Sequence, residues 1–226
     1  MQFRPTVQTT DIKPLFETAA RAPREAFYHA VAKRALDVCL VLLAALPALI
    51  VVSVLAVLVA RDGHSPFYRQ DRLGLNGRVF RLWKLRSMVP DAEARLEAHL
   101  AADPEARAEW DHAQKLRHDP RITPVGRFIR KSSLDELPQL WNVLRGDMAL
   151  VGPRPMLVEQ RAIYPGTAYY ALRPGITGFW QTSVRNESSF SERAEFDADY
   201  LSRMSLATDL RVLLKTVRVV VRGTGC

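Results

Sequence analysis

The sequence predicts a mostly helical α+β protein that is attached to a membrane. Residues 38–60 contain no charged residue, which is typical of a membrane helix. Residues 67–85 contain a glycine turn between two apolar segments, as in a β-hairpin, and residues 91–116 are charged and alanine-rich, as in exposed helices. The remaining chain has few strand signals, so we expect a compact domain with little regular sheet.

The composition of the 226 residues is that of a folded protein, with 48% hydrophobic and 25% charged residues. The formal charge of +8 would suit nucleic acid, an anionic membrane surface or a phosphorylated ligand equally well. The chain has two cysteines, Cys39 and Cys226. A disulfide-stapled secreted scaffold and a cysteine metal site are therefore not expected.

Residues 1–30 are polar and carry three prolines, so we expect a tail with one short helix near residues 24–32. Residues 31–62 are expected to form a membrane helix, because the uncharged run would extend about 30 Å, the thickness of a bilayer core. A buried core helix is the alternative. Pro47 should bend this helix, and basic residues flank both of its ends. These facts fit a re-entrant hairpin and a kinked spanning helix equally well.

Asp37 lies directly before the uncharged run, and Arg34 precedes it by three residues on the same helical face. An ion pair between them would lower the cost of burying both charges. A solvated aspartate in the headgroup layer fits the sequence equally well.

Residues 63–226 are expected to form the cytoplasmic domain. Within it, residues 91–116 should form one or two exposed helices that are interrupted at Pro104. Residues 206–222 have helical periodicity, with Arg211, Lys215, Arg218 and Arg222 along one face and apolar residues along the other. This pattern fits a helix that lies in a membrane interface. A solvated helix that packs on the core would show the same pattern.

The strongest chemical signal lies in residues 121–155, where cations surround the acidic pair Asp135-Glu136. A basic pocket that holds two carboxylates suits phosphoryl transfer, because cations offset the charge of phosphate oxygens. A carboxylate can either bind Mg²⁺ or attack phosphorus. The structural alternative is that Ser132 or Ser133 caps a helix that starts near Leu134, with the acidic pair in its first turn.

This segment and its neighbours resemble the bacterial sugar transferase family of monotopic phosphoglycosyl transferases. The resemblance covers about residues 33–223. Four blocks carry it, and their order makes it specific: Lys33-Arg-Ala-Leu-Asp, Phe80-Arg-Leu-Trp-Lys-Leu-Arg-Ser-Met, Ser133-Leu-Asp-Glu-Leu-Pro-Gln-Leu-Trp-Asn-Val-Leu-Arg-Gly-Asp-Met with Val151-Gly-Pro-Arg-Pro, and Arg173-Pro-Gly-Ile-Thr-Gly.

The resemblance implies transfer of a sugar 1-phosphate from a UDP-sugar to undecaprenyl (polyprenyl) phosphate, which initiates assembly of a cell-surface polysaccharide. Asp135 would be the nucleophile that displaces UMP and carries the sugar phosphate covalently. Glu136, together with Asp135, would hold Mg²⁺. Basic residues would bind phosphate: Lys84, Arg86, Arg130, Arg154 and Arg173.

The resemblance also implies a re-entrant membrane helix that bends at Pro47, although Leu46 stands where many members have serine. The expected location is the inner membrane, with the catalytic part on the cytoplasmic leaflet. The expected partners are the donor and the lipid acceptor, without nucleic acid, and a homodimer is left open. A non-enzymatic basic membrane adaptor is the competing hypothesis. An adaptor should tolerate Asp135→Asn, whereas an enzyme with this nucleophile should not.

Overall fold

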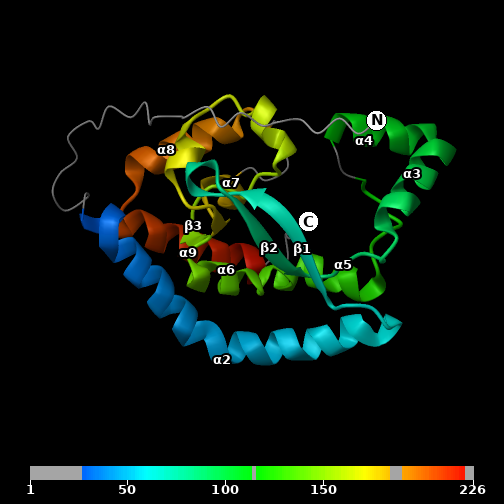
Figure 1. The fold of residues 1–226 in the computed structure, drawn as a ribbon, viewed down its shortest axis with the longest axis horizontal. Helices are drawn as coiled ribbons and strands as arrows, with labels where there is room; N and C mark the ends of the chain where they lie inside the picture. The colour runs from blue at the N-terminus through cyan, green and yellow to red at the C-terminus, as the bar shows by residue number, and fades with distance from the viewer. Residues whose placement is uncertain (1–26, 114–115, 184–189, 222–226) are drawn as a thin grey trace, which may run out of the picture.

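The computed structural model describes residues 27–113, 116–183 and 190–221. This part of the chain is mostly helical, with two small two-stranded sheets, as the sequence predicts (Figure 1). Most of the predicted tail lies outside the described residues. Its last residues enter a π-helical turn, η1 (Tyr28–Ala32), which leads directly into the long apolar helix.

The other elements follow in chain order: α2 (Lys33–Val59), η2 (Ala60–Asp62), β1 (Phe67–Leu73), η3 (Leu75–Gly77), β2 (Val79–Leu85), α3 (Ala92–Ala102), α4 (Pro104–Ala113), α5 (Pro124–Lys131), η4 (Leu134–Glu136), α6 (Gln139–Arg145), β3 (Ala149–Val151), η5 (Glu159–Ile163), η6 (Ala168–Ala171), β4 (Gly175–Thr177), α7 (Phe179–Thr182), α8 (Arg193–Arg203) and α9 (Leu206–Val221).

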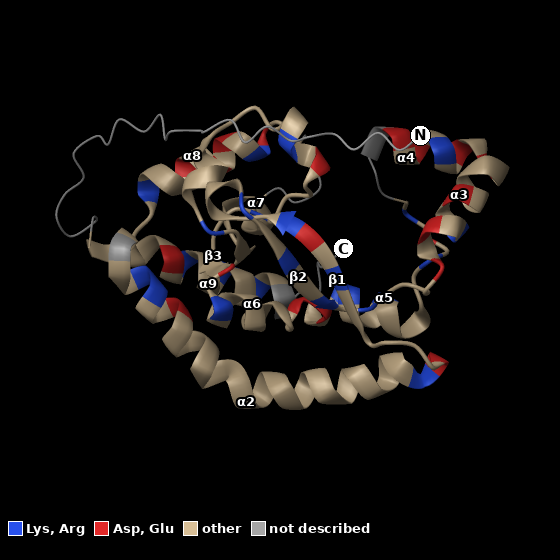
Figure 2. Cartoon of the chain, in the orientation of Figure 1, with Lys and Arg blue, Asp and Glu red and all other residues tan. Residues whose placement is uncertain are grey.

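Helix α2 is continuous, contains Pro47 and changes direction near its middle (Figure 1). A bend is the usual effect of a proline inside a helix, because the ring removes a hydrogen bond and clashes with the preceding turn. Among the described residues, α2 with η2 is the one helix that is long and apolar enough to cross a membrane. Charged residues occur at its two ends and not along its middle (Figure 2).

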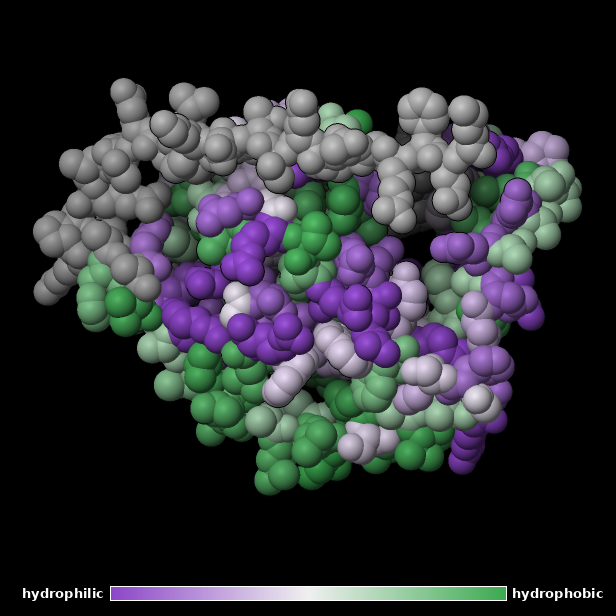
Figure 3. Space-filling view, viewed as in Figure 1, coloured by the Kyte–Doolittle hydropathy of each residue, from purple (hydrophilic) through white to green (hydrophobic). Residues whose placement is uncertain are grey.

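Both ends of α2 pack on the same body through two small hydrophobic clusters. Val41 packs with Leu82, Val143 and Met148, and the later residues Leu55 and Val59 pack with Leu85 and Ile129. Between these contacts most side chains of the helix are exposed, and Leu43 is 80% exposed. Figure 3 shows the resulting apolar band along the edge where α2 lies. Such a large exposed apolar surface indicates contact with lipid or with another apolar surface.

The polar residues at the start of α2 have structural roles that neither sequence interpretation foresaw. Arg34 donates hydrogen bonds to the carbonyls of Val143 and Leu144, and so satisfies the C-terminal end of α6. Asp37 is buried and accepts a hydrogen bond from the backbone N–H of Leu150 at 3.2 Å. Arg34 therefore caps the C-terminal end of α6, and the Asp37 carboxylate is buried and not solvated.

The predicted β-hairpin is present: β1 and β2 pair antiparallel, with Phe67 opposite Leu85. Residues 74–78 connect them, and Asn76 adopts a left-handed conformation with φ of 57°. Helices α3 and α4 confirm the two exposed helices, with Pro104 at the start of α4. Figure 1 shows this pair projecting from the rest of the protein.

Two segments of the sequence blocks, residues 151–155 and residues 173–178, meet in the second sheet, where β3 and β4 pair in parallel. Their glycines allow two backbones to approach. A Cβ on Gly175 would lie 2.1 Å from the amide nitrogen of Gly152, and one on Gly178 would lie 2.1 Å from the Gly152 carbonyl oxygen. Because these glycines lack a side chain, the two backbone segments can pack directly against each other.

Helix α9 is anchored by the buried carboxylate of Asp209, which is 1% exposed. Its Oδ2 accepts from the Tyr28 hydroxyl and the Lys33 ammonium, each at 2.6 Å, and its Oδ1 accepts from the Tyr200 hydroxyl at 2.7 Å. We call these four residues the Asp209 hub. The hub fastens the start of α2 to α8 and α9.

Along α9, Val212 is buried, whereas Leu206, Leu210, Leu214 and Val217 are exposed. These exposed apolar residues lie beside the exposed cations Arg211, Lys215 and Arg218. The predicted helix is therefore confirmed over its described length. Its apolar residues do not all face the core, because one row of them remains on the surface.

Candidate active site

The acidic pair lies on a short turn between two helices. Asp135 and Glu136 belong to the three-residue 3-10 helix η4, which separates α5 from α6. Ser133, directly before it, has φ of 57°, a left-handed conformation that costs a residue with a side chain about 1–3 kcal/mol. Strain of this kind persists where the surrounding packing fixes the direction of the chain. Here it turns the buried Asp135 back toward β2.

The helix-cap interpretation is right about the position and wrong about the cap: a 3-10 helix starts at Leu134 with the acidic pair in its first turn, but no serine side chain caps it. Ser133 makes no side-chain capping bond, and the Ser132 hydroxyl donates to the Phe128 carbonyl of the preceding helix at 2.9 Å. The next helix, α6, starts at Gln139, after the acidic pair. The two carboxylates therefore lie in the short 3-10 helix and not in the first turn of the longer helix α6.

Lys84 on β2 faces both carboxylates. Its Nζ lies 2.7 Å from Oε1 of Glu136 and 3.7 Å from Oδ2 of Asp135. The buried amide of Asn142 holds the strand in place, because its Nδ2 donates to the Arg81 carbonyl and its Oδ1 accepts from the backbone N–H of Trp83. The hairpin and α6 thus bring Lys84 to the acidic pair from a distant part of the sequence.

Burial raises the pKa of the Asp135 carboxyl above its ordinary value. The ammonium of Lys84 and the guanidinium of Arg130 act in the opposite direction, whereas the neighbouring Glu136 adds to the rise. A desolvated carboxylate is a stronger nucleophile than one in water, and the nearby cations favour its ionised form. The electrostatics of the turn therefore suit a nucleophilic role for Asp135.

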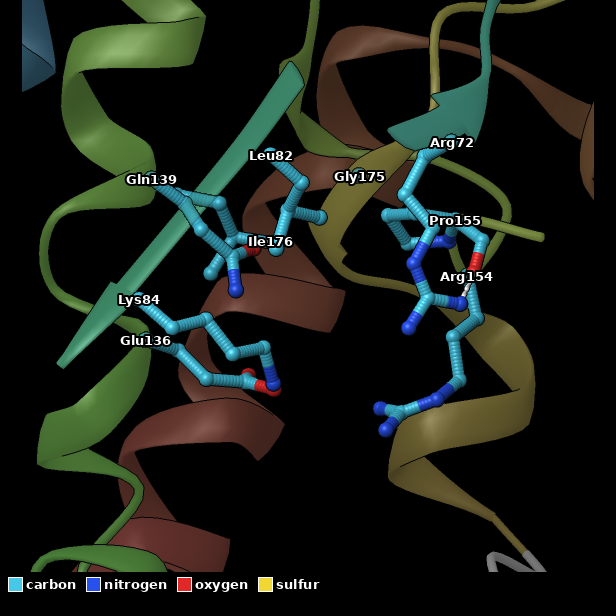
Figure 4. Close-up of a pocket in the computed structure, with 9 residues that line it drawn as sticks. All are labelled: Arg72, Leu82, Lys84, Glu136, Gln139, Arg154, Pro155, Gly175 and Ile176. Atoms are coloured by element: carbon cyan, nitrogen blue, oxygen red, sulfur yellow. Dashed lines mark hydrogen bonds and ion pairs between the residues drawn. The ribbon is translucent and has the colours of Figure 1, made fainter. Parts of the chain in front are cut away.

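A pocket opens beside this pair, with about 290 Å³ of open space (Figure 4). Lys84, Glu136 and Gln139 line one wall, and Arg72 and Arg154 lie across the space from them. Leu82, Pro155, Gly175 and Ile176 complete the lining. The pocket thus has cations on both sides and a carboxylate on one, which is an arrangement suited to a phosphorylated ligand.

The phosphate-binding residues predicted from the sequence do not all gather here. Lys84 and Arg154 line the pocket, and Arg130 is near enough to influence Asp135. Arg86 forms two hydrogen bonds to the Asp62 carboxylate, at 2.6 and 2.7 Å, and further bonds to backbone carbonyls. Arg173 is exposed, and its Nε donates to the Gly146 carbonyl. The last two therefore stand apart from the pocket lining.

Sequence reasoning missed two arginines at this site. Arg72, at the end of β1, lines the pocket, and Arg193, on α8, is buried behind Arg154. The Arg193 guanidinium lies 5.3 Å from the centre of the Trp180 ring and donates to the Arg154 carbonyl at 2.9 Å. Arg154 also lies over Trp180, at 5.6 Å. Arg72 lies in the predicted hairpin, whose pattern does not indicate which arginines turn inward, and no element was predicted for residues 193–203.

The chemistry of the donor set is compatible with Mg²⁺. Proteins commonly hold this ion through one or two carboxylates, with water and substrate phosphate as the other ligands, and Asp135 and Glu136 are two adjacent carboxylates. No group of three or more metal-binding side chains occurs within the described residues. The substrate would therefore have to complete the coordination.

Comparison with known proteins agrees with the four sequence blocks. The profile of the bacterial sugar transferase family matches residues 28–223. The chain is 50% identical over 182 residues to a UDP-galactose-lipid carrier transferase of Erwinia amylovora, across 80% of this chain and 38% of that protein. It therefore spans little more than a third of that relative.

Relatives of other lengths give the same result. The chain is 42% identical to the exopolysaccharide production protein ExoY of Rhizobium meliloti, across 86% of this chain and 88% of ExoY. It is 36% identical to the UDP-glucose:undecaprenyl-phosphate glucose-1-phosphate transferase of Xanthomonas campestris pv. campestris, across 88% of this chain and 40% of that protein. With a profile match over most of its length and these identities, the chain belongs to the bacterial sugar transferase family.

Proposed function

We propose that this protein transfers a sugar 1-phosphate from a UDP-sugar to undecaprenyl phosphate, with release of UMP, and so initiates the assembly of a cell-surface polysaccharide. The observation that carries the proposal is the buried Asp135, 3.7 Å from Lys84, which itself lines a pocket with cations on both walls. Family membership supports it, and the names of two relatives describe transfer to undecaprenyl phosphate.

In the first step, an Oδ atom of Asp135 attacks the β-phosphorus of the donor. A bond forms between that oxygen and phosphorus, and the bond from phosphorus to the oxygen that bridges the two phosphates breaks, so that UMP leaves. In the second step, a phosphate oxygen of undecaprenyl phosphate attacks the same phosphorus, and the Asp135 carboxylate is released. Each step exchanges one phosphorus–oxygen bond for another, and the covalent intermediate divides one transfer into two.

Lys84 and Glu136 would support both steps. The Lys84 ammonium favours the ionised form of Asp135 and offsets the charge of the phosphate under attack. Glu136 holds Lys84 at 2.7 Å and, with Asp135, would hold Mg²⁺. When bound, this ion would offset negative charge on the phosphate oxygens.

The membrane arrangement that we propose is re-entrant, with both ends of α2 on the cytoplasmic side of the inner membrane. Both ends pack on one body, and the bare apolar middle lies between them. A helix that crossed the membrane would instead place its two ends on opposite sides. The exposed leucines and cations of α9 suit the same interface, with the leucines toward acyl chains and the cations toward anionic headgroups.

Release of UMP from a panel of UDP-sugars tests the proposed reaction. Purified protein should form UMP in the presence of Mg²⁺ and undecaprenyl phosphate, and a chelator should stop the reaction. Asp135→Asn, which keeps the size of the side chain, should form none. If the wild type formed no UMP with any donor and both proteins still bound anionic lipid, the membrane-adaptor hypothesis would replace the enzyme.

A further inference from the structure

Arg72 is the one of the two missed arginines that lines the pocket. We propose that Arg72 binds the phosphate of the departing nucleotide, on the wall of the pocket opposite the acidic pair. That the nucleotide is a departing one rests on the proposed transfer, whereas the contact between Arg72 and a nucleotide phosphate does not. Its contacts, the charges around it and the position of the nucleophile each support the assignment.

The hydrogen bonds that Arg72 makes to described residues use two of its five N–H donors. One terminal nitrogen donates to the Pro155 carbonyl at 3.1 Å and the other to Oε1 of Gln70 at 2.6 Å. The Nε atom is buried and has no hydrogen-bond partner among the described residues. A buried donor without a partner is costly, so it indicates a ligand that completes the site. In Figure 4 the guanidinium faces the open space of the pocket.

The charges around Arg72 also call for an anion. Within the described part of the chain, no carboxylate forms an ion pair with Arg72, while Arg154 lies beside it on the same wall. Burial and the nearby Arg154 lower the pKa of the Arg72 guanidinium to about 10, so it remains charged at neutral pH. Two cations side by side repel each other, and a bound phosphate would remove this repulsion.

The backbone holds Arg72 in place before any ligand binds. Arg72 forms an isolated antiparallel bridge with Leu157, and the next residue, Leu73, donates its N–H to the Met156 carbonyl at 3.0 Å. The buried Tyr169 hydroxyl donates to the carbonyl of the same Leu73. Because the strand end is fixed to the loop that carries Arg154, the two guanidinium groups are preorganised as a pair.

The position across the pocket determines which phosphate the pair would bind. In an in-line displacement the leaving group departs on the side opposite the nucleophile. Lys84 and Glu136 line one wall, and Asp135 does not line the pocket but lies 3.7 Å from the Lys84 ammonium. The phosphate under attack therefore belongs at that wall, and the nucleotide phosphate belongs toward Arg72. As the bond breaks, the bridging oxygen takes its electron pair, and the charge on UMP increases. A fixed guanidinium stabilises that developing charge.

The experiment compares Arg72→Gln, Arg72→Lys and the control Arg69→Gln, with UMP binding measured by calorimetry on the full chain in detergent. Arg69 is exposed, lies on the same strand and packs over the Trp83 ring, so the control removes the same charge from another surface. Arg72→Gln should weaken UMP binding by about 10- to 100-fold. Arg72→Lys, which keeps the charge but lacks the planar fork, should lose less.

The outcomes separate this inference from the proposed function. Unchanged UMP affinity in either folded Arg72 variant, relative to Arg69→Gln, would overturn the inference even if the wild type transfers sugar phosphate. A loss confined to the KM for undecaprenyl phosphate would overturn it too, by assigning Arg72 to the acceptor. If the wild type binds UMP through Arg72 but forms none from any UDP-sugar, the nucleotide-phosphate site stands and the proposed reaction fails.

Discussion

Replacement of Asp209 by asparagine is expected to lower the free energy of unfolding by about 3–5 kcal/mol, the usual cost of breaking a buried ion pair. The carboxylate of the Asp209 hub accepts three hydrogen bonds, from Tyr28, Lys33 and Tyr200. An asparagine has one acceptor oxygen, so it cannot serve all three donors. The Lys33 ammonium, whose side chain is 12% exposed, would also lose its counter-charge.

For a chain of 226 residues, each kcal/mol shifts the unfolding temperature by about 2–4 °C, so we expect Asp209→Asn to lower it by roughly 6–20 °C. Tryptophan fluorescence during heating of the detergent-purified protein measures this temperature. Asp199→Asn is the matched control, because it removes a surface carboxylate that pairs with Arg203 and whose pair contributes about 0–1 kcal/mol.

The double variant Lys33→Met/Asp209→Asn should recover part of the loss, because no unpaired buried charge remains. The reasoning is refuted if Asp209→Asn unfolds at the same temperature as Asp199→Asn. It is also refuted if the double variant is as unstable as the sum of its single changes.

Three further predictions concern the titrating groups and one arginine. Lys84→Met should move the acid limb of the pH profile of kcat/KM to higher pH. The reason is that the ammonium no longer lowers the pKa of Asp135, which must be ionised to attack. If the acid limb did not move, it would report the titration of another group. Arg86→Lys should lower the unfolding temperature without changing UMP affinity, because the guanidinium holds Asp62; a loss of affinity alone would support the predicted phosphate contact. Burial raises the pKa of Asp197 from 3.8 to about 6, so the folded state keeps a proton that the unfolded chain releases. The stability of the wild type relative to Asp197→Asn, measured by denaturant unfolding, should therefore fall as the pH rises from 3.8 to 6 and stay level above it, and a flat difference would contradict this.

Local sequence patterns, such as helical periodicity, turn residues and prolines, predicted most of the fold. The hairpin of β1 and β2, the helix break at Pro104 and the long apolar helix follow from local chemistry and periodicity. The roles of Arg34 and Asp37 could not be predicted in this way. Arg34 satisfies carbonyls at the end of α6, more than 100 residues away, and periodicity carries no information about such distant partners.

The candidate site was predictable in its centre and not at its edges. The block at residues 80–88 gave Lys84 as a phosphate-binding residue, and the structure places its ammonium 3.7 Å from Asp135. The same block predicted Arg86 as a phosphate ligand, and only the fold shows that its guanidinium donates a hydrogen bond to the Asp62 carboxylate. The role of Arg72 could not be predicted, because its neighbours come from a loop that is distant in the sequence and pairs with the end of β1. A motif assigns a residue to a block, and the fold decides which way its side chain points.

The packing of α2 has a consequence for how the enzyme would respond to its lipid surroundings. Helices α5 and α6 both contact α2, and η4, with Asp135, is suspended between them. The bend of α2 lies between its contacts with α6 and α5, so a change in the bend would change the spacing of the two helices that flank Asp135, the proposed nucleophile. A thicker or thinner bilayer that opened or closed this bend would alter that spacing, so lipid composition would act on turnover as a mechanical variable, without any lipid entering the pocket.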